Sequence, residues 1–415
     1  MYKKLVIIIL FLLPLVNAMA QQRTVDEVKK SIGDLSASIN TFKTAITRIK
    51  PALTHEVSKD KAETWWVAGR AELGLYSKYR ISKSIGNKIS EKEMGHALID
   101  GYDYCVKALQ LDSVKQYRSD GSPKIDSKTG KIKVKTKYSK DIHGKLLDYL
   151  VDFSSVGAEL FKLNDWEGAY RAWGIYHQVA TSGFAHERRH AEPDSLIGLM
   201  SFYRGLSAVK MNNFEEAHSL YQQARSLGYV KKTVYDNDLM ALHKLNDTIE
   251  MVRVAREAFR LYGHSDVRYL RIMINDGINR KNYREAEVML DQAMLTDSLN
   301  AEYFDLKGNI VELQSSVLEA RPYYIRAIEL NPDLAQAQFD LGRCYYLEAL
   351  QYVKDNPRKS EKSLASAVAP VLQRALPHME KAFQLNPENY DARNILRDLY
   401  YKLGDGVKLD QLDRK

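Results

Sequence analysis

The sequence is poor in cysteine and in proline. Only Cys105 and Cys344 occur among its 415 residues, and they lie too far apart for a zinc knuckle or a thioredoxin-type redox pair. We therefore expect two buried free thiols. Ten prolines and 26 tyrosines favour long helices with aromatic packing. An apolar content of 45% excludes a simply disordered chain and a short disulfide scaffold.

Apolar runs long enough to cross a membrane are also missing. The longest, Leu5 to Val16, has twelve residues, whereas a helix that crosses about 30 Å of hydrocarbon needs roughly 20. Lys3 and Lys4 precede this run, and small residues at Ala18 and Ala20 suit signal peptidase. We predict that residues 1–20 are a cleaved signal peptide. The protein is therefore expected to be of the exported bacterial type, either periplasmic or otherwise exported.

The positive charge is concentrated in one segment. Lys and Arg number 61 against 53 Asp and Glu, a formal net charge of +8, and residues 118–140 hold eight basic and only two acidic side chains. The alternating Lys-Ile-Lys-Val-Lys run predicts a basic β-hairpin inserted between helices. The hairpin is either a solvated surface loop without a partner, or it makes a peripheral contact with anionic lipid, polysaccharide or an acidic protein. Nucleic acid is not an expected partner, because the rest of the mature chain has no excess positive charge.

Alanine recurs at a nearly constant spacing. Ala224, Ala258, Ala293, Ala327 and Ala382 are separated by 34, 35, 34 and 55 residues, and the last interval contains an insertion near 349–369. Around these alanines, small and aromatic residues keep fixed places. The best example is residues 301–332, with Gly308 at the eighth place, Ala320 at the twentieth and Tyr324 at the twenty-fourth.

This pattern resembles the tetratricopeptide repeat, a pair of antiparallel helices of 34 residues. The resemblance implies an all-α fold, a right-handed superhelix of helix pairs with the small β-hairpin inserted. The implied divisions of the chain are divergent repeat-like helices at 21–117, the basic hairpin at 118–140, partly degenerate repeats at 141–265, and a C-terminal array at 266–415. We expect that array to end in an unpaired capping helix, Tyr390 to Leu403, followed by a polar tail from Val407 to Lys415.

The resemblance also implies a binding groove, because the first helix of each repeat lines the concave face in this family. Arg271 and Asn275 match a basic residue and an asparagine that grip a peptide's terminal carboxylate in chaperone-binding members. Leu306 and Asp340 stand where other parts of that clamp would be, so we expect a partner with charges of both signs. The alternative is that these side chains pair with each other across repeats. The predicted partner-binding residues are Trp66, Arg70, Phe202, Arg268, Arg271, Asn275, Asn309, Phe339, Arg343 and Tyr346.

One motif points to catalysis instead. His186, Glu187 and His190 spell HExxH, in which two histidines one helical turn apart bind zinc and the glutamate activates water. Two arginines at the middle places and the short span between Gly183 and Pro193 argue against it, since such helices pack against a catalytic core. We therefore predict no catalytic residue, no metal and no cofactor, and keep a zinc peptidase as the alternative.

The expected function is thus a non-enzymatic, exported scaffold that binds a protein or peptide of the cell envelope through its concave groove. A third possibility is an assembly factor that oligomerises through the ends of its own superhelix. The sequence predicts no oligomeric state.

Overall fold

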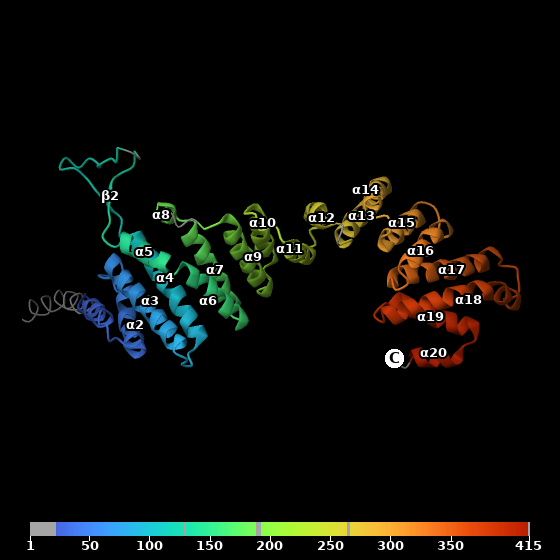
Figure 1. Ribbon diagram of the computed structural model, residues 1–415, viewed down its shortest axis with the longest axis horizontal. Helices are drawn as coiled ribbons and strands as arrows, with labels where there is room; N and C mark the ends of the chain where they lie inside the picture. The colour runs from blue at the N-terminus through green and yellow to red at the C-terminus, as the bar shows by residue number, and fades with distance from the viewer. Residues whose placement is uncertain (1–21, 128–129, 188–191, 264–265, 414–415) are drawn as a thin grey trace, which may run out of the picture. The chain divides into compact units, whose positions relative to one another are not determined.

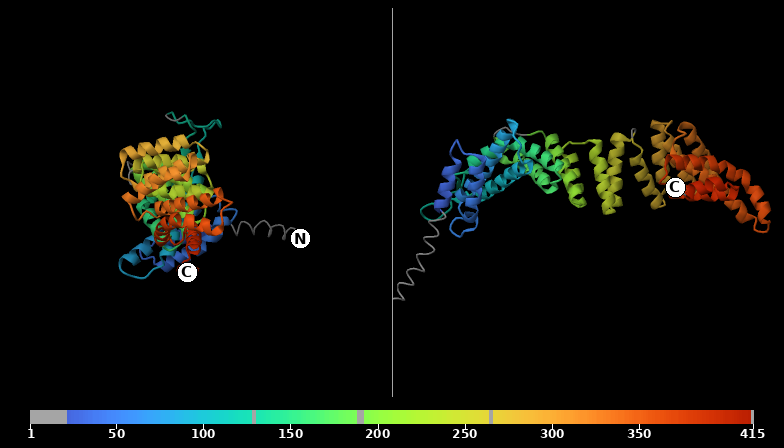
Figure 2. Two further views of the ribbon diagram at one scale, coloured as in Figure 1. Left: turned by 90° about the vertical axis from the view of Figure 1, so that its right-hand side faces the viewer. Right: turned by 90° about the horizontal axis from the view of Figure 1, so that it is seen from below.

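The computed structural model describes residues 22–127, 130–187, 192–263 and 266–413, and these are almost wholly helical (Figure 1). The chain divides into two compact units, Met1–Leu245 (unit 1) and Asn246–Lys415 (unit 2). Within each unit, successive helices pack side by side (Figure 2). The predicted signal peptide, residues 1–20, lies outside the described residues. Among those described, none of the helices is long and apolar enough to cross a membrane.

Unit 1 opens with a helix over residues 22–32. The elements that follow are α2 (Ile39–Thr54), α3 (Ala62–Ser84), α4 (Glu91–Leu111), β1 (Val114–Lys115), β2 (Val134–Lys135), α5 (Ser139–Asp148), α6 (Leu150–Lys162), α7 (Trp166–Ala180), α8 (Gly183–Glu187), α9 (Asp194–Lys210), α10 (Phe214–Ser226) and α11 (Lys232–Leu245).

Unit 2 consists of helices only, within the residues described. They are α12 (Thr248–Tyr262), α13 (Arg268–Asn279), α14 (Tyr283–Thr296), α15 (Ala301–Gln314), α16 (Val317–Leu330), α17 (Ala335–Asp355), α18 (Glu361–Leu385), α19 (Tyr390–Leu403) and α20 (Gly406–Asp413). The five alanines of the repeat register lie in α10, α12, α14, α16 and α18 and are at most 5% exposed. α10, α14, α16 and α18 are the second helices of packed pairs, and α12 holds the same place in the register. α13, α15 and α17 are the first helices of unit 2.

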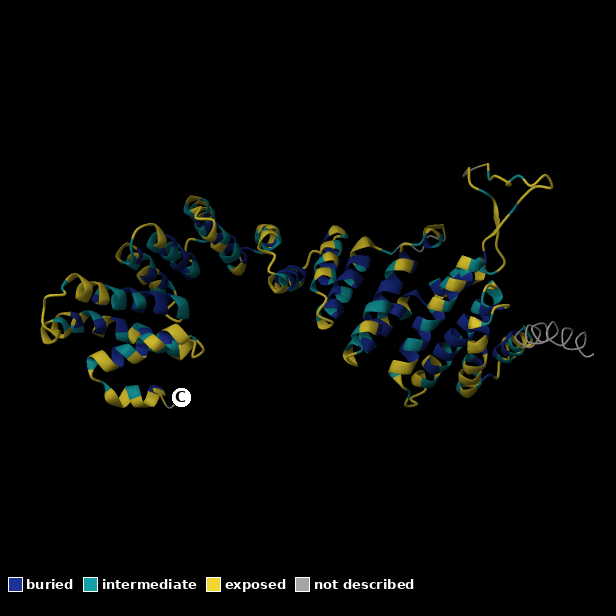
Figure 3. Ribbon diagram, turned by 180° about the vertical axis from the view of Figure 1, so that it is seen from behind, coloured by how far each residue is buried: buried dark blue, intermediate teal, exposed yellow. Residues whose placement is uncertain are grey.

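The eighth-place glycines allow paired helices to approach closely. A Cβ atom added to Gly308 of α15 would lie 2.5 Å from the ring of Tyr324 on α16. The same substitution at Gly205 of α9 would bring a Cβ within 2.4 Å of the ring of Tyr221 on α10. The twenty-fourth-place aromatic therefore packs on the glycine of its own repeat, and the buried sides of the helices face their neighbours (Figure 3).

A recurring turn begins the second helices. Asp165 caps α7 and Asn213 caps α10, each accepting a hydrogen bond from a backbone N–H of the first turn. The residue before each cap, Asn164 or Asn212, adopts a left-handed conformation that asparagine tolerates. In the same turn before α14, this place is taken by Lys281, with φ of 58°.

The predicted basic β-hairpin is present, but its first strand begins at Val114, before the predicted start at residue 118. Val114 pairs with Lys135 and Lys115 with Val134, and the side chains of both strands are exposed. Its base is fixed by the carboxylate of Asp112, which accepts hydrogen bonds from the backbone N–H groups of Lys137, Tyr138 and Ser139 at 2.8–3.0 Å. The hairpin projects from α4 and α5 and is attached only at that end (Figures 1 and 3).

Two C-terminal features differ from a simple reading of the sequence. The insertion near 349–369 is built as extra helical turns, because α17 runs on to Asp355 and α18 begins at Glu361. The capping helix α19 is followed by a second one, α20, where the sequence had suggested a polar tail. Leu412 of α20 is 5% exposed and belongs to the core of this end of unit 2.

Candidate partner-binding face

Charged side chains join the first helices of unit 2 to one another. Arg271 of α13 donates a hydrogen bond from Nη2 to the carboxylate of Glu302 on α15, at 3.0 Å. The two side chains are 35% and 38% exposed. The pair is therefore accessible to solvent, and its ionic part contributes little to stability.

The next pair, between α15 and α17, is more deeply placed. Both terminal nitrogens of Arg343 donate to the carboxylate of Glu312, at 2.7 Å each. Arg343 also donates to Asp340 at 3.1 Å, and the hydroxyl of Tyr324 donates to Glu312 at 3.0 Å. With the Arg343 side chain 23% exposed and that of Glu312 20% exposed, this two-pronged contact fixes the two first helices against each other.

Beneath these pairs lies a buried carboxyl group that receives no hydrogen bond from a donor. Asp305 of α15 is fully buried, and neither of its carboxylate oxygens accepts a hydrogen bond within the described residues. Burial, and then the negative charge of Asp340, raise the pKa of Asp305 to about 8. Asp340 itself accepts hydrogen bonds from Gln336 and Arg343, so Asp305 is the member of the pair that holds a proton at neutral pH.

We define the first-helix face as Arg271, Asn275, Glu302, Glu312 and Arg343 on α13, α15 and α17. Asn275 is exposed and makes no polar contact within the described residues. The alternative left open by the sequence, pairing across repeats, is therefore how Arg271 and Arg343 are arranged. Binding of a partner by these residues stays a prediction.

The other predicted binding residues are placed differently. Trp66, Phe202 and Phe339 are 7–9% exposed and belong to the core, so they offer little surface to a partner. Arg70 is half-buried in unit 1.

Three further predicted residues on unit 2 already have partners within it. Arg268 pairs with Asp266, and the Oδ1 atom of Asn309 lies 3.1 Å from the hydroxyl of Tyr324 that contacts Glu312. Tyr346 donates to Asp398 on α19 at 2.8 Å.

Sequence reasoning named the groove positions but not the contacts between them. Arg271 and Glu302 are 31 residues apart, and so are Glu312 and Arg343. Opposite charges that repeat at this separation on first helices are a signal that the sequence contains. Glu348, which accepts from Arg321 at 2.9 Å, was not anticipated because it lies four turns into a helix lengthened by the insertion.

The HExxH motif lies partly outside the described residues. His186 and Glu187 end the short helix α8, whereas residues 188–191, including His190, are not described. Among the residues that are, no three histidine, cysteine, aspartate or glutamate side chains lie close enough to hold a metal ion. Cys105 and Cys344 are buried free thiols, as expected.

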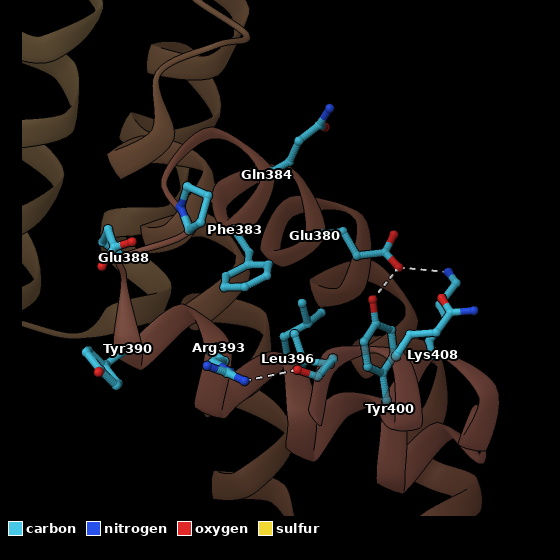
Figure 4. A pocket seen from close by; sticks show the side chains of 12 residues that line it. Glu380, Phe383, Gln384, Glu388, Tyr390, Arg393, Leu396, Tyr400 and Lys408 are labelled. Carbon is cyan, nitrogen blue, oxygen red and sulfur yellow. Dashed lines mark hydrogen bonds and ion pairs between the residues drawn. The ribbon is translucent and has the colours of Figure 1, made fainter. Parts of the chain in front are cut away.

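A pocket of about 960 Å³ lies between α18, α19 and α20 (Figure 4). Its polar groups bind one another: Glu380 accepts hydrogen bonds from the hydroxyl of Tyr400 at 2.9 Å and from Lys408 at 2.8 Å. Arg393 donates to the carbonyl oxygen of Leu412 at 3.0 Å. These contacts fix α20 against α18 and α19 at the C-terminal end of unit 2.

The chain matches a family model described as tetratricopeptide repeat over residues 314–349, from the end of α15 through most of α17. Together with the register of paired helices, this match shows that the protein contains tetratricopeptide repeats, as the sequence pattern predicts. No curated protein matches the chain.

Several solved structures are similar in fold at low identity. One is YrrB, described as a TPR protein with an unusual peptide-binding site, with 16% identity over 51% of this chain and 96% of that chain (TM-score 0.30). Another is the C-terminal part of a TPR repeat-containing protein from Cytophaga hutchinsonii, with 14% identity over 62% and 91% (TM-score 0.35). A third is the TPR domain of P58(IPK), with 14% identity over 93% and 99% (TM-score 0.30).

Proposed function

We propose that the protein is an exported, non-enzymatic scaffold that binds a protein or peptide of the cell envelope along the first-helix face of unit 2. The observation that carries this proposal is the half-exposed pair of opposite charges, Arg271 on α13 and Glu302 on α15, on helices that keep the repeat register of the matched segment 314–349. Repeats of this kind stack into extended surfaces that suit an elongated partner.

The partner engages the Arg271 end of the face. There the ion pair with Glu302 is open to solvent, so a carboxylate of the partner can take over Arg271 while water solvates Glu302. The exposed amide of Asn275, one helical turn further along α13, offers a second polar contact. A basic group of the partner can bind Glu302 in turn, which accounts for a ligand with both charge signs.

The test begins with crosslinking in native envelopes, followed by calorimetry with the recovered partner. Arg271→Ala should weaken the affinity by about tenfold to a hundredfold, because a hydrogen bond to a desolvated charged group is lost. Arg326→Ala is the matched control, since Arg326 is an exposed arginine on the second helix α16 with its own ion pair to Glu329. Equal affinities of Arg271→Ala and wild type would show that the partner does not bind at the first-helix face.

Export rests on residues 1–20 alone. Mature protein that begins near Gln21 should be released from bacterial cells by osmotic shock. Recovery only from detergent-extracted membranes, with the first residues intact, would contradict export of a cleaved chain. Any contact with a membrane surface would be peripheral, through the basic hairpin.

A further inference from the structure

A groove on unit 2 lies away from the first-helix face. Two second helices, α12 and α14, form its walls, and α13 packs between them as its floor. Its volume is about 600 Å³, within the range of about 300–1,000 Å³ that ligand pockets occupy. Figure 1 shows α12, α13 and α14, the three helices that line the groove, in succession along the chain.

The floor and one wall of the groove are apolar. Met273 of α13 is 5% exposed at the bottom, and Phe259 of α12 and Met289 of α14 flank it, both half-buried. Val288 of α14 is 49% exposed at the edge. Methionine side chains adapt to the shape of an inserted group, so this floor suits a large aliphatic or aromatic side chain.

The rim of the groove is basic. Arg256, Arg260 and Arg284 line it, against a single carboxylate, that of Glu285. Glu285 is already held by other groups, because it accepts hydrogen bonds from Arg280 at 3.1 Å and Asn282 at 2.8 Å.

These contacts leave the rim arginines largely uncompensated. The closest approach of Arg256 to Glu285 is 3.9 Å, and Arg260 and Arg284 make no ion pair or hydrogen bond within the described residues. The groove therefore presents the guanidinium groups of Arg260 and Arg284, which no side chain among the described residues of unit 2 neutralises.

We propose that this groove binds a segment of a partner protein in which a large apolar side chain is flanked by carboxylates. The apolar side chain enters the space above Met273, and aspartate or glutamate side chains on either side pair with Arg260 and Arg284. Guanidinium groups bind carboxylates through two parallel hydrogen bonds, which gives this arrangement specificity as well as charge complementarity. The site is separate from the first-helix face, so it does not depend on the proposed function.

The test uses a phage-displayed library of random twelve-residue peptides, selected on the full chain. The peptides that bind the wild-type chain most tightly are then tested against the double variant Arg260→Glu/Arg284→Glu. We expect these peptides to share an apolar residue with an acidic residue within two positions on each side. Measured by fluorescence anisotropy, their affinity should fall at least about tenfold for the double variant.

Two further variants make the result specific. Val288→Glu should also weaken binding, because it places a charge at the apolar edge and repels the acidic flanks. Arg358→Glu should bind like wild type, since Arg358 is an exposed arginine in the loop between α17 and α18 with no partner among the described residues. Its charge change equals that of either single substitution in the double variant, at a distance from the groove.

Several outcomes would overturn the proposal. Peptides that bind the double variant as well as wild type, or that show no acidic residues, would mean that the arginines are not a recognition site. Peptides unaffected by Val288→Glu would show a charge contact that does not use the apolar floor. A single-stranded oligonucleotide that competes with every selected peptide and binds more tightly would show that the arginines of the rim bind phosphate groups rather than carboxylates.

Discussion

Replacing Asp305 by asparagine should stabilise unit 2 at neutral pH and have little effect in acid. Asp305 is fully buried on α15, and its oxygens accept no hydrogen bond within the part of the chain that the structure describes. Burial and the charge of Asp340 raise the pKa of Asp305 to about 8, whereas an aspartate in the unfolded chain has a pKa of about 3.9. The folded state therefore binds a proton that the unfolded chain releases.

The sign and size of the effect follow from this difference. Below about pH 4 Asp305 is protonated in both states, and its burial costs no charge. Between about pH 4 and pH 8 each pH unit removes up to about 1.4 kcal/mol from the free energy of unfolding, and above about pH 8 the loss is complete. At pH 7 the loss reaches about 4 kcal/mol as an upper bound. Asparagine has nearly the same shape and no charge, so Asp305→Asn escapes this loss.

Thermal unfolding followed by circular dichroism at pH 5, 7 and 8 measures the effect. The melting temperature of Asp305→Asn relative to wild type should rise with pH, by about 2–4 °C per kcal/mol for a unit of this size. Asp340→Asn is the matched control, because Asp340 accepts hydrogen bonds from Gln336 and Arg343 that its replacement weakens. The increase in melting temperature of Asp340→Asn should therefore be smaller than that of Asp305→Asn. An advantage of Asp305→Asn that is equal at pH 5 and pH 8 would refute the reasoning.

Five other variants test local features of the structure, each by its melting temperature against wild type. Arg343→Ala should cost about 2–3 kcal/mol because it leaves a half-buried carboxylate unpaired, whereas Arg271→Ala should cost less than about 1 kcal/mol; equal losses would contradict the difference in burial. Asp112→Ala should cost about 2 kcal/mol, since three backbone N–H groups lose a charged acceptor. Replacing residues 117–132 by Asn-Gly should change stability by less than about 1 kcal/mol, because only loop closure is altered, and a larger loss would mean that the hairpin packs on the helices. Lys281→Asn should add about 0.5–1 kcal/mol by relieving a left-handed lysine; a loss would show that its side chain makes a stabilising contact.

The repeat register could be predicted because it depends on residue size at fixed places. Gly308 and Tyr324 are sixteen residues apart, and their contact requires a glycine whatever the neighbouring repeats contain. The bounds of the capping helix, Tyr390 to Leu403, agree with the sequence pattern for the same reason. α20 could not be predicted in this way, because its stretch is of mixed polarity and it is held by Leu412, the partly buried Leu409 and polar contacts with α18 and α19.

The binding residues were harder to predict, because one place on a first helix can face either a partner or the next first helix. Phe339 is 8% exposed and contributes to the core, whereas Arg343, one turn further along the same helix, reaches back to Glu312. Which of the two surroundings a side chain meets depends on the stacking of α15 on α17. That stacking is a relation between repeats, and the spacing within one repeat does not contain it.

The two ion pairs on the first-helix face therefore serve different purposes. A carboxylate that displaced Glu312 from Arg343 would leave Glu312 close to Asp340 and to the protonated Asp305, in a region with little access to water, and the displaced charge would be costly. Displacing Glu302 from Arg271 leaves a glutamate that is already 38% exposed and easily solvated. The α15–α17 junction thus holds the repeats in register. At the α13–α15 junction, a carboxylate of the partner can replace Glu302 as the group that binds Arg271. Mutations at the first should change mainly the stability of unit 2, and mutations at the second mainly its affinity for a partner.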